Sequence, residues 1–190
     1  MYLDTHDYPF ITNLEKCFAE IRQECLALPG TTFDPWVQKE MYGEGWSVFG
    51  LVAWGHQIEG ALALCPETKK ALEAIPGLQT AGFSRLAPGT HIKPHRGWVE
   101  NVYRLHLGLV VPENCAMRVG EETRSWEEGR CLVFDDTSEH EAWNHSKSDR
   151  LVLLLDFLRP GCSPTNNAEM PPEVRQMLAA KLSRGSRGRE

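Results

Sequence analysis

Apolar residues recur at spacings of three and four along residues 11–28. This is the period of one face of an α-helix, so the segment predicts an amphipathic helix, which the following Pro29 and Gly30 end. A shorter helix is predicted over residues 66–75, where a Pro-Gly pair again follows the last apolar position. Another helix is predicted near the end of the chain, over residues 171–182.

Between these helices the chain consists of short apolar runs separated by turn residues. Residues 45–55, GWSVFGLVAWG, carry aromatic and β-branched side chains between glycines, which is typical of a β-strand. Further strands are predicted at 79–87, 102–111, 115–119, 130–134 and 150–158. Many short strands at such spacing favour a sandwich or barrel of the jelly-roll kind. No repeat or linker divides the chain, so the sequence predicts a single, mainly β domain over residues 1–190 with flanking helices.

Length and charge narrow the class of protein. The chain has 190 residues and a net charge of 20 − 26 = −6, which argues against a general nucleic-acid binder because such proteins neutralise phosphates with basic residues. No apolar run approaches the roughly 20 residues that a membrane span needs. The first ten residues do not resemble a signal peptide, and the six cysteines form no C-x-x-C pair, so a cytoplasmic protein is expected. The basic, glycine-rich tail at about residues 183–190 is expected to be disordered.

Two of the seven histidines, His95 and His140, stand where a β-barrel enzyme would place metal ligands. His95 follows the turn-forming segment APGTHIKP, and His140 follows the acidic loop FDDTSE. Their separation of 140 − 95 = 45 residues excludes a helical pair, but two strands of one barrel can bring them together. Spacing alone does not decide between a metal site and ordinary surface or core histidines. The ordinary interpretation is adopted for His6, His56, His91 and His145.

Arg150, Arg104 and His106 are the other candidates for chemistry. Arg150 begins the apolar strand RLVLLLDF, and a guanidinium on such a strand face is costly unless a carboxylate meets it. That carboxylate could come from a bound ligand, or from Asp135, Asp136 or Asp156 in a structural ion pair. Arg104 and His106 lie two residues apart on one strand, so both side chains point into the same volume.

Four motifs stand in order between Ser84 and Phe157, namely PGTHxxPHxG, RxHLGL, WxEGxxxxFDD and EHExxN. With these motifs at this spacing, the stretch resembles the aspartyl/asparaginyl β-hydroxylase family. The members of that family are iron(II)- and 2-oxoglutarate-dependent oxygenases built on a double-stranded β-helix, a jelly-roll, cupin-like fold. The resemblance therefore implies a hydroxylase that uses iron(II), 2-oxoglutarate as co-substrate and O₂.

Carried over residue by residue, the family implies that His95 and His140 ligate iron. Neutral imidazoles suit this metal. The resemblance further implies five contacts with 2-oxoglutarate: Arg150 and the hydroxyl of Ser84 at the distal carboxylate, Arg104 and His106 on the other side, and Trp46 lining the pocket.

Gly97 stands two residues after His95, where many iron enzymes carry an acid as the third ligand. Glycine cannot ligate, so the two histidines, 2-oxoglutarate and water are expected to complete the site. A similar vacancy occurs in iron halogenases, where chloride fills it, but the resemblance points to hydroxylation. Asp135 and Asp136 either shape the turn before His140 or orient imidazole N–H groups.

The resemblance implies hydroxylation of the β-carbon of an Asp, Asn or related amino acid that is free, peptidyl or carrier-bound. Related bacterial enzymes that hydroxylate lipid A acyl chains share the RxHLGL motif. They tend to carry an acid at the place of Gly97 and to be membrane-associated, which favours the amino-acid substrate here. A jelly-roll module that binds a small molecule or metal without catalysis is the remaining alternative. No nucleic-acid partner and no membrane span are expected.

Overall fold

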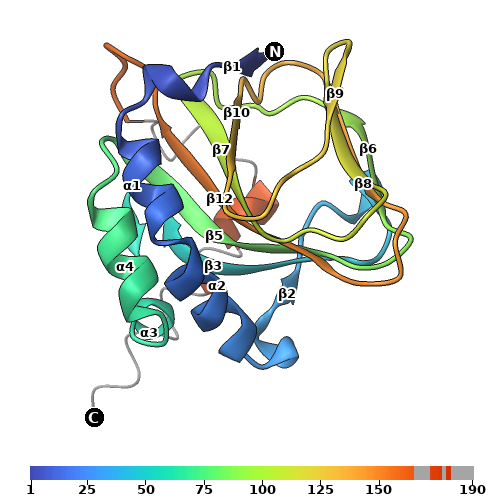
Figure 1. Cartoon of the computed structure of the whole chain (residues 1–190), viewed down its shortest axis with the longest axis horizontal. Coiled ribbons are helices and arrows are strands. Elements are labelled where there is room, and N and C mark those ends of the chain that lie inside the picture. Colours follow the sequence, from blue (N-terminus) through green and yellow to red (C-terminus); the bar gives the residue numbers. More distant parts are fainter. Residues whose placement is uncertain (165–171, 177–178, 181–190) are drawn as a thin grey trace.

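The computed structural model describes residues 1–164, 172–176 and 179–180, and it has two antiparallel sheets that face each other (Figure 1). The large sheet has the strand order β1-β10-β7-β12-β5-β3-β2, with β4 paired to β3. The small sheet has the order β6-β11-β8-β9. Two facing antiparallel sheets with this strand order form a jelly roll, which confirms the predicted fold class.

The elements have the following bounds. The large sheet contains β1 (Tyr2–Leu3), β2 (Asp34–Pro35), β3 (Trp46–Ala53), β4 (His56–Gln57), β5 (Leu78–Leu86), β7 (Val102–Val110), β10 (Cys131–Phe134) and β12 (Arg150–Leu158). The small sheet contains β6 (His91–His95), β8 (Cys115–Val119), β9 (Glu122–Arg124) and β11 (His140–Asn144). The helices are α1 (Phe10–Lys16), α2 (Phe18–Ala27), α3 (Glu59–Leu62) and α4 (Pro66–Glu73).

The predicted helix over residues 11–28 is two helices in the structure. The backbone leaves helical values at Cys17, where φ is −85° and ψ is 6°, and α2 starts at the next residue. This break lets both halves reach the core, because Ile11 of α1 and Ile21 of α2 are both buried in the cluster against the large sheet. The prediction of one continuous helix was therefore wrong at that point.

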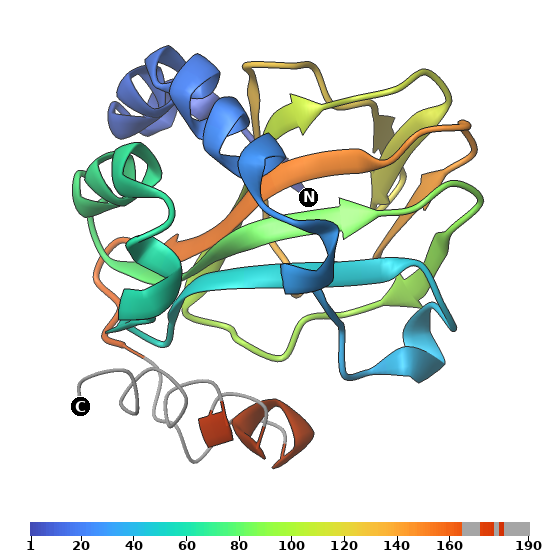
Figure 2. The ribbon, with the colours of Figure 1, turned by 90° about the horizontal axis from the view of Figure 1, so that it is seen from below.

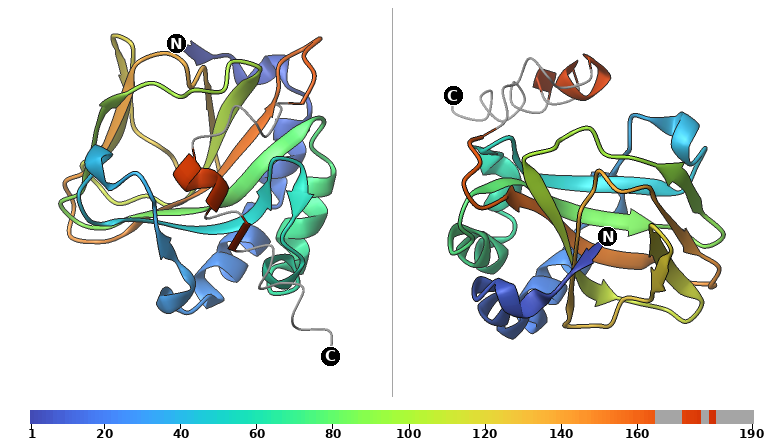
Figure 3. Two further views of the ribbon diagram at one scale, coloured as in Figure 1. Left: turned by 180° about the vertical axis from the view of Figure 1, so that it is seen from behind. Right: turned by 90° about the horizontal axis from the view of Figure 1, so that it is seen from above.

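The large sheet is buried on both faces. Its outer face packs against α1, α2 and α4 through residues such as Phe83, Leu105 and Leu153, and the helices gather on that side (Figure 2). Its inner face packs against the small sheet, where Val152 and Met117 share a second buried cluster. Figure 3 shows the same layers from two further sides. The candidate site lies between the two sheets.

Two of the strands that the sequence patterns missed, β6 and β11, bear the candidate metal ligands, and the short strands β1, β2, β4 and β9 were missed as well. Residues 91–95 form β6, residues 140–144 form β11, and neither range is among the predicted strands. β6 buries only Ile92, and β11 alternates between buried and partly buried positions, so neither strand contains an apolar run.

The predicted C-terminal helix is seen in part. Residues 172–176 and 179–180 are helical, and Val174 is buried beside Ala53. The remaining positions of that helix and the predicted tail at 183–190 lie outside the described residues. Within the described part of the chain, none of the helices has the length and apolar character needed to cross a membrane.

Candidate active site

His95 and His140 face each other across neighbouring strands of the small sheet. His95 ends β6 and His140 begins β11, and the two residues are register partners in the antiparallel pair. Their ring centroids lie 4.1 Å apart. The 45-residue separation in sequence is thus closed by strand pairing, and both imidazoles are available to one small volume.

The backbone sets the tautomer of both rings. Nδ1 of His95 lies 2.7 Å from the carbonyl oxygen of Lys93, and Nδ1 of His140 lies 2.8 Å from that of Ser138. A carbonyl oxygen only accepts, so Nδ1 carries the proton in each neutral ring. The Nε2 lone pairs are therefore free for a metal ion, which is the arrangement that oriented metal-binding histidines show.

Burial keeps both rings neutral. It lowers the pKa of His95, and it lowers the pKa of His140 to about 3, with the neighbouring His95 as the second cause. Since metal binding needs the unprotonated imidazole, this environment favours a ligand at neutral pH.

The same pKa makes the stability of the metal-free protein depend on pH. Unfolded His140 takes up a proton as pH falls through about 6.5, whereas folded His140 does so only near 3. The unfolded state therefore binds more protons, and His140 should lower the free energy of unfolding by about 2 kcal/mol between pH 7 and pH 5. Urea denaturation at both pH values checks this. His140→Asn should flatten the dependence, and the exposed His145→Asn should not; an unchanged slope in His140→Asn would refute the assignment.

Gly97 lies against the carboxylate of Asp136. Its N–H donates to the Asp136 carbonyl oxygen at 2.8 Å, and a Cβ placed on Gly97 would overlap Oδ2 of the same aspartate. The other carboxylate oxygen lies 3.3 Å from Nε2 of His140. The volume that an acidic side chain at position 97 would occupy is thus taken by Asp136. Among the described residues, no set of three His, Cys, Asp or Glu side chains is arranged to hold a metal ion.

Gly97→Asp is expected to destabilise the protein and to leave metal affinity no better than in the wild type. The new side chain would collide with Asp136 and place a second carboxylate beside it, at a cost of about 2–3 kcal/mol. Chemical denaturation and anaerobic iron(II) titration measure the two effects. Gly120→Asp is the matched control, because a Cβ at Gly120 meets open space, although its φ of +60° adds backbone strain. A Gly97→Asp protein of wild-type stability that binds iron more tightly would contradict this account.

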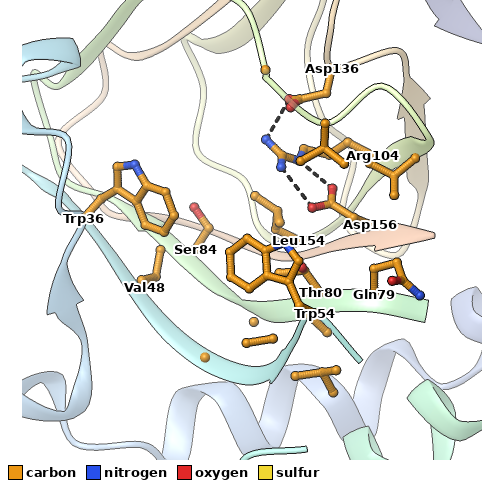
Figure 4. A pocket seen from close by; sticks show the side chains of 18 of the residues that line it. Trp36, Val48, Trp54, Gln79, Thr80, Ser84, Arg104, Asp136, Leu154 and Asp156 are labelled. Atoms are coloured by element: carbon orange, nitrogen blue, oxygen red, sulfur yellow. Dashed lines mark hydrogen bonds and ion pairs between the residues drawn. The ribbon is translucent and has the colours of Figure 1, made fainter. Parts of the chain in front are cut away.

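Arg104 is held by two carboxylates. Its Nη1 donates to Asp136 at 2.6 Å, and its Nε and Nη2 donate to Asp156 at 2.7 and 3.0 Å (Figure 4). Arg104 and Asp156 are register partners on β7 and β12. Arg104 therefore fixes Asp136 beside His140, and its guanidinium reaches the pocket already ion-paired.

Arg150 has the opposite environment. The side chain is 2% exposed, and no carboxylate of the described residues pairs with it. Of the acids that could have paired with it, Asp135 binds Arg159, whereas Asp136 and Asp156 bind Arg104. Nε of Arg150 has no hydrogen-bond partner within the part of the chain that is described, Nη1 reaches the Ser84 carbonyl oxygen at 3.5 Å, and the guanidinium also interacts with the Cys115 thiol. Burial lowers the pKa of this guanidinium to about 10, so it is still charged at neutral pH.

His106 presents a second donor without a partner in this interior. Its Nδ1 accepts a hydrogen bond from Nε1 of Trp126 at 3.2 Å, and its Nε2 is buried with no partner among the described residues. Burial, followed by the nearby charge of Arg150, holds the pKa of His106 well below its usual range. Two unpartnered donors in one dry interior are costly to the free protein, so an acceptor that reached both would be favoured there.

Ser84 and Trp46 lie between these donors and the open pocket. Nε1 of Trp46 donates to the Ser84 hydroxyl oxygen at 3.1 Å, which leaves the hydroxyl hydrogen free to donate elsewhere. The Trp46 ring packs on Trp36 and Tyr42, and these contacts fix its position.

A cavity of about 190 Å³ runs from His95, Ser84 and Arg104 along the inner face of β3 and β5. Its walls away from the histidine are mostly apolar and aromatic (Figure 4), and they include Trp36, Met41, Val48, Trp54, Trp98 and Leu154. The rings of Trp54 and Trp98 stack at a centroid distance of 5.9 Å. The cavity can therefore hold an apolar group close to the histidine pair.

The structure brings together the seven side chains predicted from the sequence, which come from β3, β5, β6, β7, β11 and β12: Trp46, Ser84, His95, Arg104, His106, His140 and Arg150. The other four histidines take no part in this site, and His91 pairs instead with Glu141. The sequence analysis gave no role to Trp126, and it considered Asp136 and Asp156 as partners of Arg150 whereas both bind Arg104. The signal for Trp126 was present, since it begins the WxEG motif, and Asp156 is the only polar residue within the strand RLVLLLDF after its first position.

The sequence of this chain matches one protein family and several of its members. The family described as aspartyl/asparaginyl β-hydroxylase matches residues 15–160. An ornithine lipid ester-linked acyl 2-hydroxylase from Rhizobium tropici is 41% identical over 174 residues, which cover 85% of this chain and 61% of that protein. The human aspartyl/asparaginyl β-hydroxylase is 36% identical over 172 residues, which cover 85% of this chain and 22% of that protein. The chain thus spans less than two thirds of the length of either relative.

A solved structure has the same fold as this chain. An oxidoreductase of the 2OG-Fe(II) oxygenase family from Burkholderia pseudomallei superposes with a TM-score of 0.54 at 14% identity, over 78% of this chain and 81% of that one. At this identity the likeness speaks for the shared jelly roll alone.

Proposed function

Since this chain belongs to the aspartyl/asparaginyl β-hydroxylase family, we propose that it is an iron(II)- and 2-oxoglutarate-dependent hydroxylase. We propose the whole chain as one oxygenase domain, and the cytoplasmic location remains a prediction from the sequence. The seven side chains of the site keep the roles that the family resemblance implies for them.

The residues present fit the metal. Two neutral imidazoles, each with Nδ1 anchored on a backbone carbonyl and Nε2 free, are suitable donors for iron(II). His95 and His140 would hold the ion, and the Asp136 carboxylate, which accepts a hydrogen bond from Arg104, lies 3.3 Å from Nε2 of His140. When bound, iron(II) with 2-oxoglutarate and O₂ supplies the oxidising power that converts C–H to C–OH, with succinate and CO₂ as the other products.

One observation carries the proposal, and it is the buried guanidinium of Arg150 without a carboxylate. A dry, unpaired cation is unfavourable unless an anion binds to it, and a carboxylate matches the fork of guanidinium donors. The free Nε2–H of His106 and the hydroxyl of Ser84 add neutral donors in the same interior. Together they fit a small dicarboxylate such as 2-oxoglutarate, whose distal carboxylate would meet Arg150.

Two substrate classes remain, and each has support. The family of the chain favours the β-carbon of an Asp, Asn or related amino acid, free, peptidyl or carrier-bound. The apolar cavity beside His95 favours an acyl chain as the second candidate, and the Rhizobium tropici relative is named for acyl hydroxylation. An anion in the volume next to Gly97, as in a halogenase, is disfavoured because the Asp136 carboxylate already lies there.

The test is a product analysis with both substrate classes. The iron-loaded protein is incubated with 2-oxoglutarate, O₂ and either Asp- and Asn-containing peptides or ester-linked acyl lipids, with and without chloride. A mass gain of one oxygen coupled to succinate supports the hydroxylase, and the substrate that gains it identifies the class. A chlorinated product, or oxygen insertion that does not require 2-oxoglutarate, would overturn the proposal.

A further inference from the structure

Trp126 contacts His106 and Arg150, the two residues that carry a buried donor without a partner among the described residues. It lies in the connection between β9 and β10, and its side chain is 2% exposed. We infer that Trp126 is a positioning residue that fixes the proton of His106 and the orientation of Arg150 for an incoming carboxylate. This inference rests on the proposed function for the identity of the ligand. Its two structural consequences can be measured in the ligand-free protein.

The first consequence concerns the tautomer of His106. The indole Nε1–H of Trp126 only donates, and it points at Nδ1 of His106 over 3.2 Å. Nδ1 must therefore be the acceptor, so the neutral ring carries its single proton on Nε2. Nε2 is the atom left without a partner, and Trp126 thus makes it a hydrogen-bond donor. With the opposite tautomer, the same atom would present a lone pair and repel a carboxylate.

The second consequence concerns Arg150. Its Cζ lies 4.7 Å from the centroid of the Trp126 ring, within the range of a cation–π contact. An aromatic face steadies a guanidinium without occupying its N–H donors, whereas a protein carboxylate would occupy them and compete with the ligand. This explains how a buried arginine can persist without an acid and keep Nε free.

The backbone holds Trp126 in place against β7, the strand that bears His106. A Cβ on Gly108 would overlap the Glu127 carbonyl oxygen, so only glycine lets the segment approach this closely. Gly108 N–H donates to the Arg130 carbonyl oxygen at 3.1 Å, and Gly129 N–H donates to the Gly108 carbonyl oxygen at 2.9 Å. The WxEG motif and the glycine of RxHLGL therefore act together to place one indole.

The test starts with the ligand-free protein. Heteronuclear NMR of ¹⁵N-labelled histidine should show the Nε2–H tautomer for His106 in the wild type. Trp126→Phe keeps a ring face and removes the N–H, so the Nδ1–H tautomer should appear. The affinity for 2-oxoglutarate should then fall about tenfold, as expected for one lost hydrogen bond and a weaker ring contact. Trp126→Leu removes the face as well, and its affinity should fall about a hundredfold.

Trp143→Phe is the matched control. Trp143 stacks on His145 at 6.1 Å and 26°, much as Trp126 stacks on His106 at 6.0 Å and 24°, but it lies away from the site. It should leave both the His106 tautomer and the 2-oxoglutarate affinity unchanged. A wild-type His106 with its proton on Nδ1, or a folded Trp126→Phe with an unchanged tautomer, would overturn the inference. A wild-type protein that binds no 2-oxoglutarate would overturn the proposed function instead, and the tautomer would still decide the role of Trp126.

Discussion

Arg150→Ala is expected to weaken 2-oxoglutarate binding about a thousandfold while the protein stays folded. Loss of one partner from a desolvated charge pair costs roughly 2–5 kcal/mol, and here the pair forms only when the anion binds. Isothermal titration of 2-oxoglutarate into the anaerobic, iron-loaded protein measures the change. An affinity within a few-fold of the wild type would remove Arg150 from the site.

The free energy of unfolding provides a second test of the role of Arg150. Arg150 is buried and pairs with no carboxylate of the described residues, so the volume-conserving Arg150→Met should leave the free energy of unfolding unchanged or raise it by about 1–2 kcal/mol. Arg104→Met is the matched control, because it strands Asp136 and Asp156 without their cation and should cost about 3 kcal/mol. A large destabilisation by Arg150→Met would favour a structural role for this arginine.

His95→Ala and His140→Ala are each expected to lower iron(II) affinity by more than about a hundredfold, beyond the loss usual for groups that only orient a ligand. With two protein ligands, removal of either leaves one imidazole. Anaerobic titration of iron(II) in the presence of 2-oxoglutarate measures the loss. His56→Ala and His145→Ala are the controls, since both histidines are exposed and lie away from the pair. Equal loss from His145→Ala would mean that the wrong histidine of the HEAWNH segment had been chosen.

The sequence predicted the buried strands of the fold well, because a buried strand appears in the sequence as a run of apolar residues. β12 is buried along almost its whole length and matches the predicted residues 150–158, and β8 matches 115–119. β6 and β11 were not predicted as strands, since β6 buries only Ile92 and two of the three buried residues of β11, His140 and Asn144, are polar. The two candidate metal ligands therefore lie on strands whose local sequence pattern is weak, and strand pairing brings them together.

The residues of the candidate site were predicted from the sequence, but the ion pairs and contacts between them were not. Family motifs pointed to Arg104 and Arg150 alike, and nothing in the sequence separates an arginine held by two acids from one that has none. Nor could spacing reveal that Asp136 fills the volume beside Gly97, because that contact depends on how the loop before β11 folds back. Such pairings are properties of the tertiary structure.

Succinate formation from 2-oxoglutarate tests whether the chain is an iron(II)- and 2-oxoglutarate-dependent hydroxylase. It is measured with both substrate classes present and with iron(II) and O₂ supplied or withheld in turn. We expect succinate only when iron(II) and O₂ are both supplied, and little or none from Arg150→Ala under the same conditions. Succinate formation independent of iron(II) or O₂, or none at all from folded, iron-loaded wild-type protein, would contradict it.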